Sequence, residues 1–232
     1  METLPGGLTL QISEGCFPLS TDSMALADFI KLPRGARVLD LGSGCGSLGL
    51  LLAGRDPGCH ITGIEITETA HEAAVRNIQR NGLDCRMESL CRDLRQVPSF
   101  LKSGSFHCCI SNPPYFGGGP RSAKLPAARR QDFCSTGDLF SAAVWATKFG
   151  GDFFLVQRPE QLGELIGEGF QAGFACKRLR LLHHRENGPV SLILLQLRKG
   201  ARSGMTIDEI SLWDRSGNPT EDYKRIYHIE EA

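Results

Sequence analysis

The residues best suited to chemistry form the run Asn112-Pro113-Pro114-Tyr115, which follows an apolar, strand-like stretch at 106–110. The side-chain carbonyl of Asn112 and the backbone carbonyl of Pro113 can each accept a hydrogen bond from an –NH₂ group. The two prolines fix the backbone φ angle, and Tyr115 offers a flat face for stacking. The run predicts a catalytic site that recognises a planar amide or amine nitrogen. Taken alone it also fits a simple loop, because the residue before a proline is pushed out of the helical region.

A second candidate site lies upstream, where an apolar stretch at 37–41 runs into a glycine-rich turn and then an apolar helix at 47–53. Glycines in a βα turn let the backbone turn tightly and approach a nucleotide closely. The next strand-like stretch, 60–65, ends in Glu65, which is placed to bind ribose hydroxyls. Asp93 follows a third strand and is expected to contact an adenine amino group. The predicted nucleotide-binding residues are Asp40, Gly42, Ser43, Gly44, Gly46, Glu65, Ile66, Asp93 and Asn112.

The glycine spacing argues against a dinucleotide-dependent oxidoreductase. The turn reads Gly-x-Gly-x-Gly, so the pyrophosphate-binding pattern Gly-x-Gly-x-x-Gly lacks its last glycine, which falls at Ser47-Leu48. Asp40 stands just before the first glycine. An acid there would repel a pyrophosphate, but it suits an ammonium group or can organise the turn.

Taken together, these motifs resemble those of the class I S-adenosylmethionine-dependent methyltransferases. The resemblance rests on Asp40-Leu41-Gly42-Ser43-Gly44-Cys45-Gly46, on Glu65 and on the Asn-Pro-Pro-Tyr run, each at its usual spacing. It implies that S-adenosylmethionine is the cofactor and that the recognised nitrogen is the methyl acceptor.

The two ends of the chain resemble those of one particular group of methyltransferases. Residues 6–12 and 15–29 are similar to the start of the bacterial tRNA (adenine-N6) methyltransferases that modify the anticodon loop of a valine tRNA, and 210–227 are similar to their end. The likeness thus spans nearly the whole chain. It implies a tRNA partner and methylation of an adenine N6 amine in the anticodon loop.

One loop departs from that family. Where the family carries Ala-Arg-His-Glu after the Asn-Pro-Pro-Tyr run, this chain has Ala128-Arg129-Arg130-Gln131, which replaces an imidazole and a carboxylate by a fixed cation and a neutral amide. Cations in this loop could hold RNA phosphates, and so could a second basic run at 177–185. The alternative for both runs is solvated surface charge; we favour phosphate contact for the loop and solvation for the run at 177–185. The predicted substrate-binding residues are Tyr115, Arg121, Lys124, Arg129 and Arg130.

Composition limits the other possibilities. The chain has 232 residues, with 26 Lys plus Arg against 26 Asp plus Glu, so any RNA contact must come from local patches. Nine cysteines without a Cys-x-x-Cys pair or a zinc-like Cys/His cluster indicate free thiols in a reducing cytoplasm and no metal site. Neither a signal peptide nor an apolar run of about 18 residues is evident. We therefore expect a cytoplasmic protein that needs no membrane, and expect it to be a monomer.

Strand and helix signals alternate along the chain, which predicts an α/β, Rossmann-like fold. We expect a seven-stranded, mostly parallel sheet with helices on both faces and an antiparallel edge strand. The last two predicted strands, 178–183 and 190–197, flank a Glu-Asn-Gly-Pro turn and would form that edge pair. A single methyltransferase domain would span 1–232, with a hairpin and helix extension at 1–30, a catalytic core at 31–200 and a tail at 201–232.

Three alternatives stay open. A glutamine methyltransferase acting on a release factor would use the same amide-recognising turn, although the residues before 37 leave little room for the helical N-terminal domain of those enzymes. A guanine-N2 methyltransferase of ribosomal RNA would recognise the exocyclic –NH₂ group of guanine through the same Asn-Pro-Pro-Tyr run. The third alternative is an inactive methyltransferase-like binding module, against which the intact glycine turn and Asn112 argue.

Overall fold

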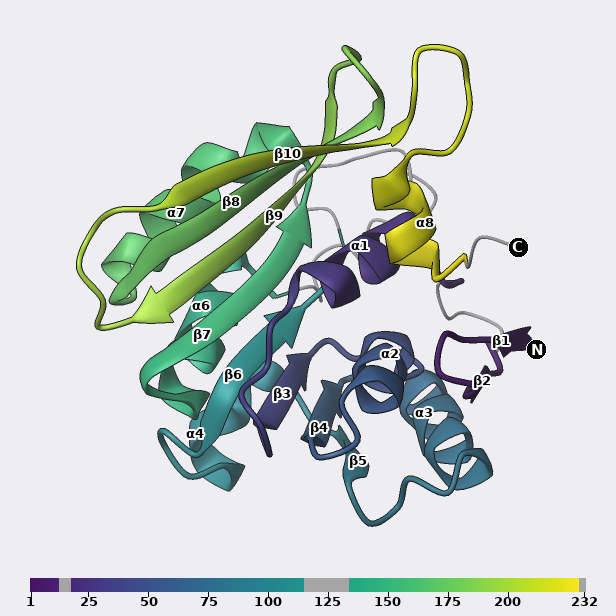
Figure 1. Ribbon diagram of the computed structural model, residues 1–232. Helices are drawn as coiled ribbons and strands as arrows, with labels where there is room; N and C mark the ends of the chain where they lie inside the picture. Colours follow the sequence, from purple (N-terminus) through teal and green to yellow (C-terminus); the bar gives the residue numbers. More distant parts are fainter. Residues whose placement is uncertain (13–17, 115–133, 230–232) are drawn as a thin grey trace, which may run out of the picture.

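The computed structural model describes residues 1–12, 18–114 and 134–229. Within these residues the chain forms an eight-stranded sheet with the strand order β10-β8-β9-β7-β6-β3-β4-β5 (Figure 1). Neighbouring strands are parallel except in the two pairs that contain β9, so the predicted α/β class is confirmed. The strands are β3 (Arg37–Leu41), β4 (His60–Glu65), β5 (Met87–Cys91), β6 (Phe106–Ser111), β7 (Thr147–Gln157), β8 (Phe174–Arg185), β9 (Val190–Lys199) and β10 (Thr206–Trp213).

The prediction of seven strands is wrong, because part of the expected C-terminal tail forms β10. This strand pairs in parallel with β8 and makes the edge of the sheet, so the antiparallel pair β8 and β9 lies inside it. Only Ile210 and Leu212 of β10 are buried. A half-exposed edge strand has no continuous apolar run, which is why its sequence resembles a polar tail.

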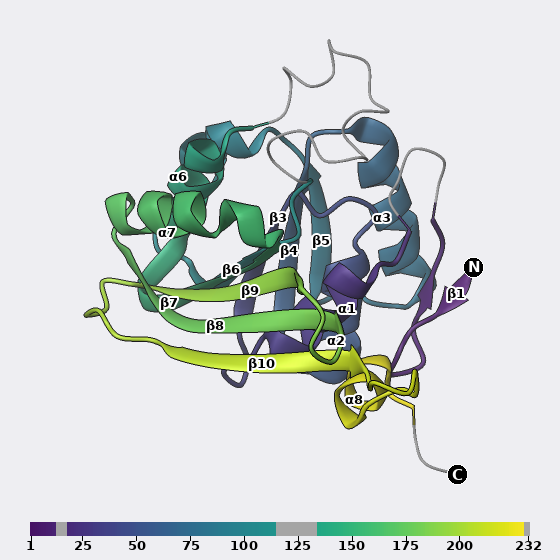
Figure 2. The ribbon, with the colours of Figure 1, turned by 90° about the horizontal axis from the view of Figure 1, so that it is seen from above.

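Helices cover both faces of the sheet, as predicted (Figure 2). One hydrophobic cluster joins the sheet to α1, α2, α3 and α8, and another joins its opposite face to α4, α6 and α7. The helices are α1 (Thr21–Phe29), α2 (Ser47–Arg55), α3 (Glu68–Arg80), α4 (Val97–Phe100), α6 (Thr136–Ala146), α7 (Leu162–Gln171) and α8 (Glu221–Tyr227), with short 3₁₀ turns η1 (Leu94–Gln96) and η3 (Pro159–Gln161).

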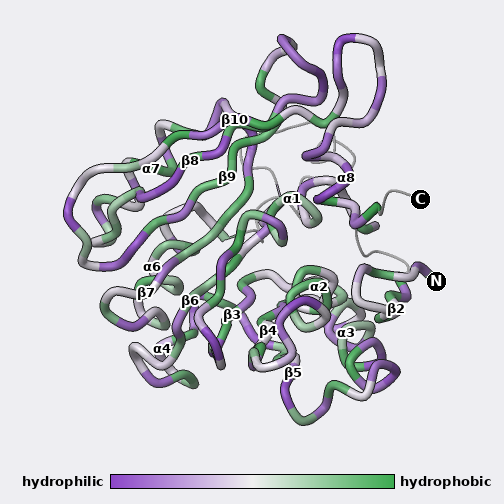
Figure 3. Tube along the Cα trace, in the orientation of Figure 1, coloured by the Kyte–Doolittle hydropathy of each residue, from purple (hydrophilic) through white to green (hydrophobic). Residues whose placement is uncertain are grey.

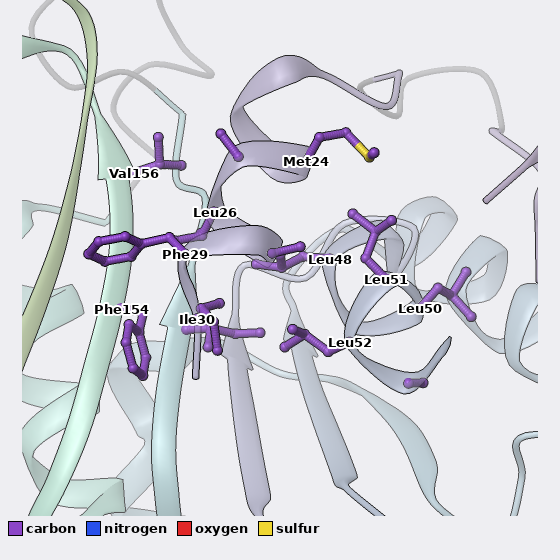
Figure 4. Packing of buried hydrophobic residues seen from close by; sticks show 14 of the residues in the cluster. Met24, Leu26, Phe29, Ile30, Leu48, Leu50, Leu51, Leu52, Phe154 and Val156 are labelled. Carbon is purple, nitrogen blue, oxygen red and sulfur yellow. The ribbon is translucent and has the colours of Figure 1, made fainter. Parts of the chain in front are cut away.

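The central strands are apolar on both faces, as expected for strands buried between two helical layers. In β7, Phe154 belongs to the cluster around α1 and α2, whereas the adjacent Phe153 belongs to the cluster around α6. Figure 4 shows Phe154 and Val156 of β7 with Leu26, Phe29 and Ile30 at α1. Hydrophobic segments gather along β9 and α2, whereas the loop after β10 is hydrophilic (Figure 3).

Both ends of the chain are attached to these layers. A hairpin of β1 (Glu2–Thr3) and β2 (Thr9–Leu10) is held by α3, where Asn81 Oδ1 accepts a 2.8 Å hydrogen bond from the Thr9 backbone N–H. At the other end, α8 is joined to α1 by a 2.8 Å hydrogen bond between the Tyr227 and Thr21 hydroxyl groups. No helix in the described part of the chain is both long and apolar enough to cross a membrane.

Candidate active site

Those predicted site residues that the structure describes lie at the carboxyl edge of the parallel strands. The chain passes from β3 to β4 and β5 in one direction, and β6 lies on the other side of β3, so the strand order reverses between β3 and β6. In open α/β sheets, ligands bind in the crevice outside the carboxyl ends of the strands at such a switch point. Asn112, Glu65 and the glycine turn, which come from distant parts of the sequence, are therefore brought to one edge.

The glycine turn after β3 has backbone φ angles that would be strained in a residue with a side chain. Gly42, Gly44 and Gly46 have φ angles of +77°, +56° and +84°. The Gly42 N–H donates a 2.9 Å hydrogen bond to the Ile64 carbonyl at the end of β4. In the described part of the chain, a Cβ atom at Gly42 or Gly44 would meet nothing within 4 Å beyond its chain neighbours. Open space thus adjoins both residues, and a ligand can come close to this backbone.

Gly46 differs from the other two glycines. It precedes α2, and a Cβ atom there would lie 3.3 Å from the methyl group of Met87 and 3.5 Å from Cβ of Ala74. Its position among side chains of β5 and α3 shows that Gly46 permits close packing of α2.

Glu65 connects the end of β4 to the glycine turn. Its Oε2 accepts a 2.9 Å hydrogen bond from the Gly44 N–H, and its Oε1 accepts a 2.8 Å bond from the Thr67 N–H. A carboxylate oxygen has two lone pairs, so both oxygens keep acceptor capacity for a ligand. Ile66 beside it is 55 % exposed, an unusual exposure for a large apolar side chain at a strand end.

Asp93 lies beyond the end of β5 and already has a partner. Its carboxylate accepts hydrogen bonds of 2.8 and 2.6 Å from the Arg95 guanidinium, and it caps η1 by accepting from the Arg95 backbone N–H. The side-chain hydrogen bond from Arg95 lowers the pKa of Asp93. Arg95 therefore holds the Asp93 carboxylate in place. An adenine amino group that binds Asp93 would donate to a carboxylate that also accepts from Arg95.

Asp40 is a buried acid below the glycine turn. Only 2 % of its surface is exposed, and its Oδ2 has no hydrogen-bond partner within the described residues. Burial, with a further contribution from the charge of Glu65, raises the pKa of Asp40 to about 7. Ser43 Oγ is likewise buried and unpartnered among the described residues, and it packs against Gly63, where a Cβ atom would lie only 2.7 Å away.

Asn112 follows β6 directly. Its Nδ2 donates a 2.9 Å hydrogen bond to Oγ of Ser23, a residue of α1 that is only 4 % exposed. The neighbouring Ser111 hydroxyl donates a 2.7 Å bond to the Leu41 carbonyl, which fixes the end of β6 against β3. Pro113 is buried and Pro114 is exposed. Ser23 was not among the predicted site residues, because it lies 89 positions from Asn112; the family-like stretch at 15–29 was the available signal.

The other predicted substrate-binding residues fall outside the described part of the chain. These are Tyr115, Arg121, Lys124, Arg129 and Arg130.

Two arginines of the second basic run, Arg178 and Arg180, form ion pairs within the fold. Arg180 is nearly buried and forms ion pairs of 2.5 Å with Asp208 and 3.1 Å with Asp28. Arg178 forms a 2.9 Å pair with the same Asp208. These two arginines therefore join β8 to β10 and α1, and are engaged by carboxylates where the sequence suggested phosphates.

One cavity in the described part of the chain lies away from the glycine turn, Glu65 and Asn112. It has a volume of about 650 Å³ and is bounded by the N-terminal hairpin, α1, α2 and α8. Its described lining contains none of the predicted nucleotide-binding residues. Among the described residues there is also no group of three His, Cys, Asp or Glu that could hold a metal ion.

A glycine turn after the first central strand, an acid ending the next and an amide beyond β6 together define a class I methyltransferase fold. The chain belongs to the methyltransferase small-domain family, whose model matches residues 19–172. Relatives named tRNA1(Val) (adenine(37)-N6)-methyltransferase include one from Vibrio parahaemolyticus, 31% identical over 80% of this chain and 77% of its own. Another, from Serratia proteamaculans, is 26% identical over 90% of this chain and 81% of its own.

Solved structures share the fold. A predicted O-methyltransferase from Agrobacterium tumefaciens superposes with a TM-score of 0.75 at 23% identity, covering 90% of this chain and 96% of that one. TrmN from Thermus thermophilus superposes with a TM-score of 0.57 at 23% identity, covering 76% of this chain and 48% of that one. At such identities these similarities show the fold alone. The family model and the relatives confirm the predicted class and family, and the protein is a methyltransferase.

Proposed function

We propose that this enzyme transfers a methyl group from S-adenosylmethionine to the exocyclic N6 amine of an adenine in a tRNA anticodon loop. The observation that carries the proposal is the orientation of Asn112. Its Nδ2 is used by Ser23, and its Oδ1 accepts no hydrogen bond from the described part of the chain. An acceptor oxygen at the carboxyl edge suits an –NH₂ donor. The relatives named tRNA1(Val) (adenine(37)-N6)-methyltransferase support the choice of adenine and tRNA.

The residues around the glycine turn fit S-adenosylmethionine. The open space at Gly42 and Gly44 admits a ligand against the backbone, and the unpartnered Oδ2 of buried Asp40 suits an ammonium group. Glu65 would accept hydrogen bonds from the ribose hydroxyls, and the exposed Ile66 would cover an apolar face of the adenine ring. Asp93 would accept from the adenine amino group while Arg95 holds it.

When bound, S-adenosylmethionine supplies a methyl group on a positively charged sulfur, which needs no further activation. The protein's task is then to position the acceptor nitrogen in line with that methyl group. Asn112 Oδ1 and the Pro113 carbonyl would accept hydrogen bonds from the two N–H groups of the adenine amine. These bonds would direct the nitrogen lone pair toward the methyl group and stabilise the positive charge that develops on nitrogen.

The substrate base would be held by stacking and by phosphate contacts. Tyr115 would stack on the extruded adenine, which contributes roughly 1–3 kcal/mol in base–aromatic contacts of this kind. An anticodon loop lowers the cost of extruding the base, because its bases are unpaired. Arg121, Lys124, Arg129 and Arg130 would bind phosphates without reading sequence.

A direct assay tests the proposal. The purified enzyme would be incubated with radiolabelled S-adenosylmethionine and, in parallel, bulk tRNA, ribosomal RNA or a release factor. We expect label in tRNA only, and expect nuclease digestion to give N6-methyladenosine. Label in the release factor would indicate glutamine methylation, and methylguanosine in ribosomal RNA would indicate guanine-N2 methylation; either result would reject the proposed substrate.

A further inference from the structure

The hydrogen bond between Asn112 and Ser23 joins the end of β6 to α1. Asn112 is half-buried, Ser23 is buried, and the distance from Asn112 Nδ2 to Ser23 Oγ is 2.9 Å. An asparagine amide has a donor end and an acceptor end of almost the same shape, so its environment decides which end faces a ligand. With the Nδ2 end bonded to Ser23, the acceptor end faces away from α1.

We propose that Ser23 is a positioning residue that anchors the Asn112 amide to α1, in the orientation in which Oδ1 meets the acceptor amine. This inference rests on the proposed role of Asn112. Without the Ser23 hydroxyl, the amide loses its anchor on α1 and can rotate about its side-chain bonds. Oδ1 would then no longer be held toward the acceptor amine, and the productive orientation would be lost.

Ser23 can serve this purpose because α1 is fixed from several sides. In its first turn, Thr21 is bonded to Tyr227 of α8. Near the end of the helix, Asp28 pairs with Arg180 of β8 and with Arg225 of α8. Met24, Leu26 and Phe29 pack in the core between α2 and β7 (Figure 4). Ser23 therefore projects from a rigid helix, and the C-terminal helix α8 helps to hold it in place.

The test compares Ser23→Ala with Ser20→Ala. Both variants remove one serine hydroxyl from the start of α1, but Ser20→Ala removes the helix cap and keeps the oxygen that Asn112 contacts. We expect Ser23→Ala to lower kcat at least about tenfold, the size of one lost hydrogen bond to a developing charge, with the S-adenosylmethionine Kd within about twofold of the wild type. Ser20→Ala should keep kcat within about twofold, although the loss of its cap costs stability.

A second measurement reports on the amide itself. In protein labelled with ¹⁵N-asparagine, the Asn112 side-chain NH₂ signals are assigned as those missing in Asn112→Ala. We expect these signals to shift and to exchange faster with water in Ser23→Ala, and to stay in place in Ser20→Ala. This readout needs no activity, so it separates the anchoring of Asn112 from the choice of substrate.

Each outcome decides a different point. A kcat of Ser23→Ala within twofold of the wild type, or an equal loss in Ser20→Ala, would overturn the positioning role. Unchanged Asn112 signals in Ser23→Ala would overturn it as well. If instead the wild type methylates no RNA while the signals shift as expected, the proposed function fails and the anchoring of the amide stands.

Discussion

Glu65 Oε2 accepts a 2.9 Å hydrogen bond from the backbone N–H of Gly44, so the end of β4 is joined to the glycine turn after β3. The acid that the sequence suggests as a ribose ligand therefore also supports the turn beside which the ligand would lie. The Glu65 carboxylate can be half-buried because each of its oxygens accepts a hydrogen bond from a backbone N–H before any ligand is bound.

Replacement of Glu65 should weaken cofactor binding. We expect Glu65→Ala to raise the S-adenosylmethionine Kd by about 10- to 100-fold, which corresponds to about 1.5–3 kcal/mol for hydrogen bonds to a charged group. The Kd of Glu65→Gln should lie between those of the wild type and Glu65→Ala, because glutamine keeps one acceptor for Gly44 and loses the charge. Calorimetric titration measures each Kd. Glu88→Ala is the control, since Glu88 is a strand carboxylate on β5 that accepts a 2.8 Å bond from Thr62. Equal Kd values for the wild type and Glu65→Ala would remove Glu65 from the site.

The buried Asp40 predicts a pH dependence of stability. Its pKa is raised to about 7 in the folded protein by burial and by Glu65, whereas in an unfolded chain it is about 4. Between these values the folded state holds a proton that the unfolded state has lost, so this group's contribution to stability falls as pH rises from about 4 to about 7 and then levels off. Asp40→Asn should remove this component, as measured by urea unfolding at pH 5, 6, 7 and 8.

The same acid predicts proton release on cofactor binding. An ammonium group near Asp40 favours its charged form, so binding near pH 7 should expel a proton. Calorimetry in two buffers with different ionisation heats measures that proton. The heat difference should vanish in Asp40→Asn; equal proton release by both proteins would place the ammonium group elsewhere.

The basic loop should contribute to RNA affinity without affecting the cofactor. Replacing Arg129 and Arg130 by alanine should weaken tRNA binding and reduce the slope of log Kd against log salt by roughly one unit for each phosphate that the variant no longer binds. The matched control replaces the exposed Lys31 and Arg34, which precede β3 and therefore lie toward the opposite edge of the sheet. Equal salt slopes for the two double variants would assign Arg129 and Arg130 to plain solvation.

The sequence was most informative where a local pattern carries a long-range consequence. Apolar stretches at β3, β4 and β6 predicted strands of a mostly parallel sheet. Parallel strands place their carboxyl ends together, which is why Glu65, Asn112 and the glycine turn lie at one edge. The apolar helix predicted at 47–53 is α2, Ser47–Arg55.

What escaped prediction depends on pairing between distant residues. The half-exposed β10 was missed because its sequence has no clear strand pattern. The strand is formed by backbone pairing with β8, which the sequence of β10 alone does not show. The arginines at 178 and 180 were expected to be solvated or to contact phosphates, because Asp28 and Asp208, their ion-pair partners, lie far away in sequence. Ser23 was missed for the same reason.

The central claim is that Asn112 orients an adenine amine for methylation, and mapping the methyl group in the wild type and Asn112→Ala tests it most directly. Each protein is incubated with labelled S-adenosylmethionine and tRNA, and the product is digested and sequenced by mass spectrometry. We predict N6-methyladenosine in the anticodon loop with the wild type, and none above background with Asn112→Ala, whose cofactor Kd should rise less than that of Glu65→Ala because the glycine turn and Glu65 are untouched. Full methylation by Asn112→Ala would contradict the account.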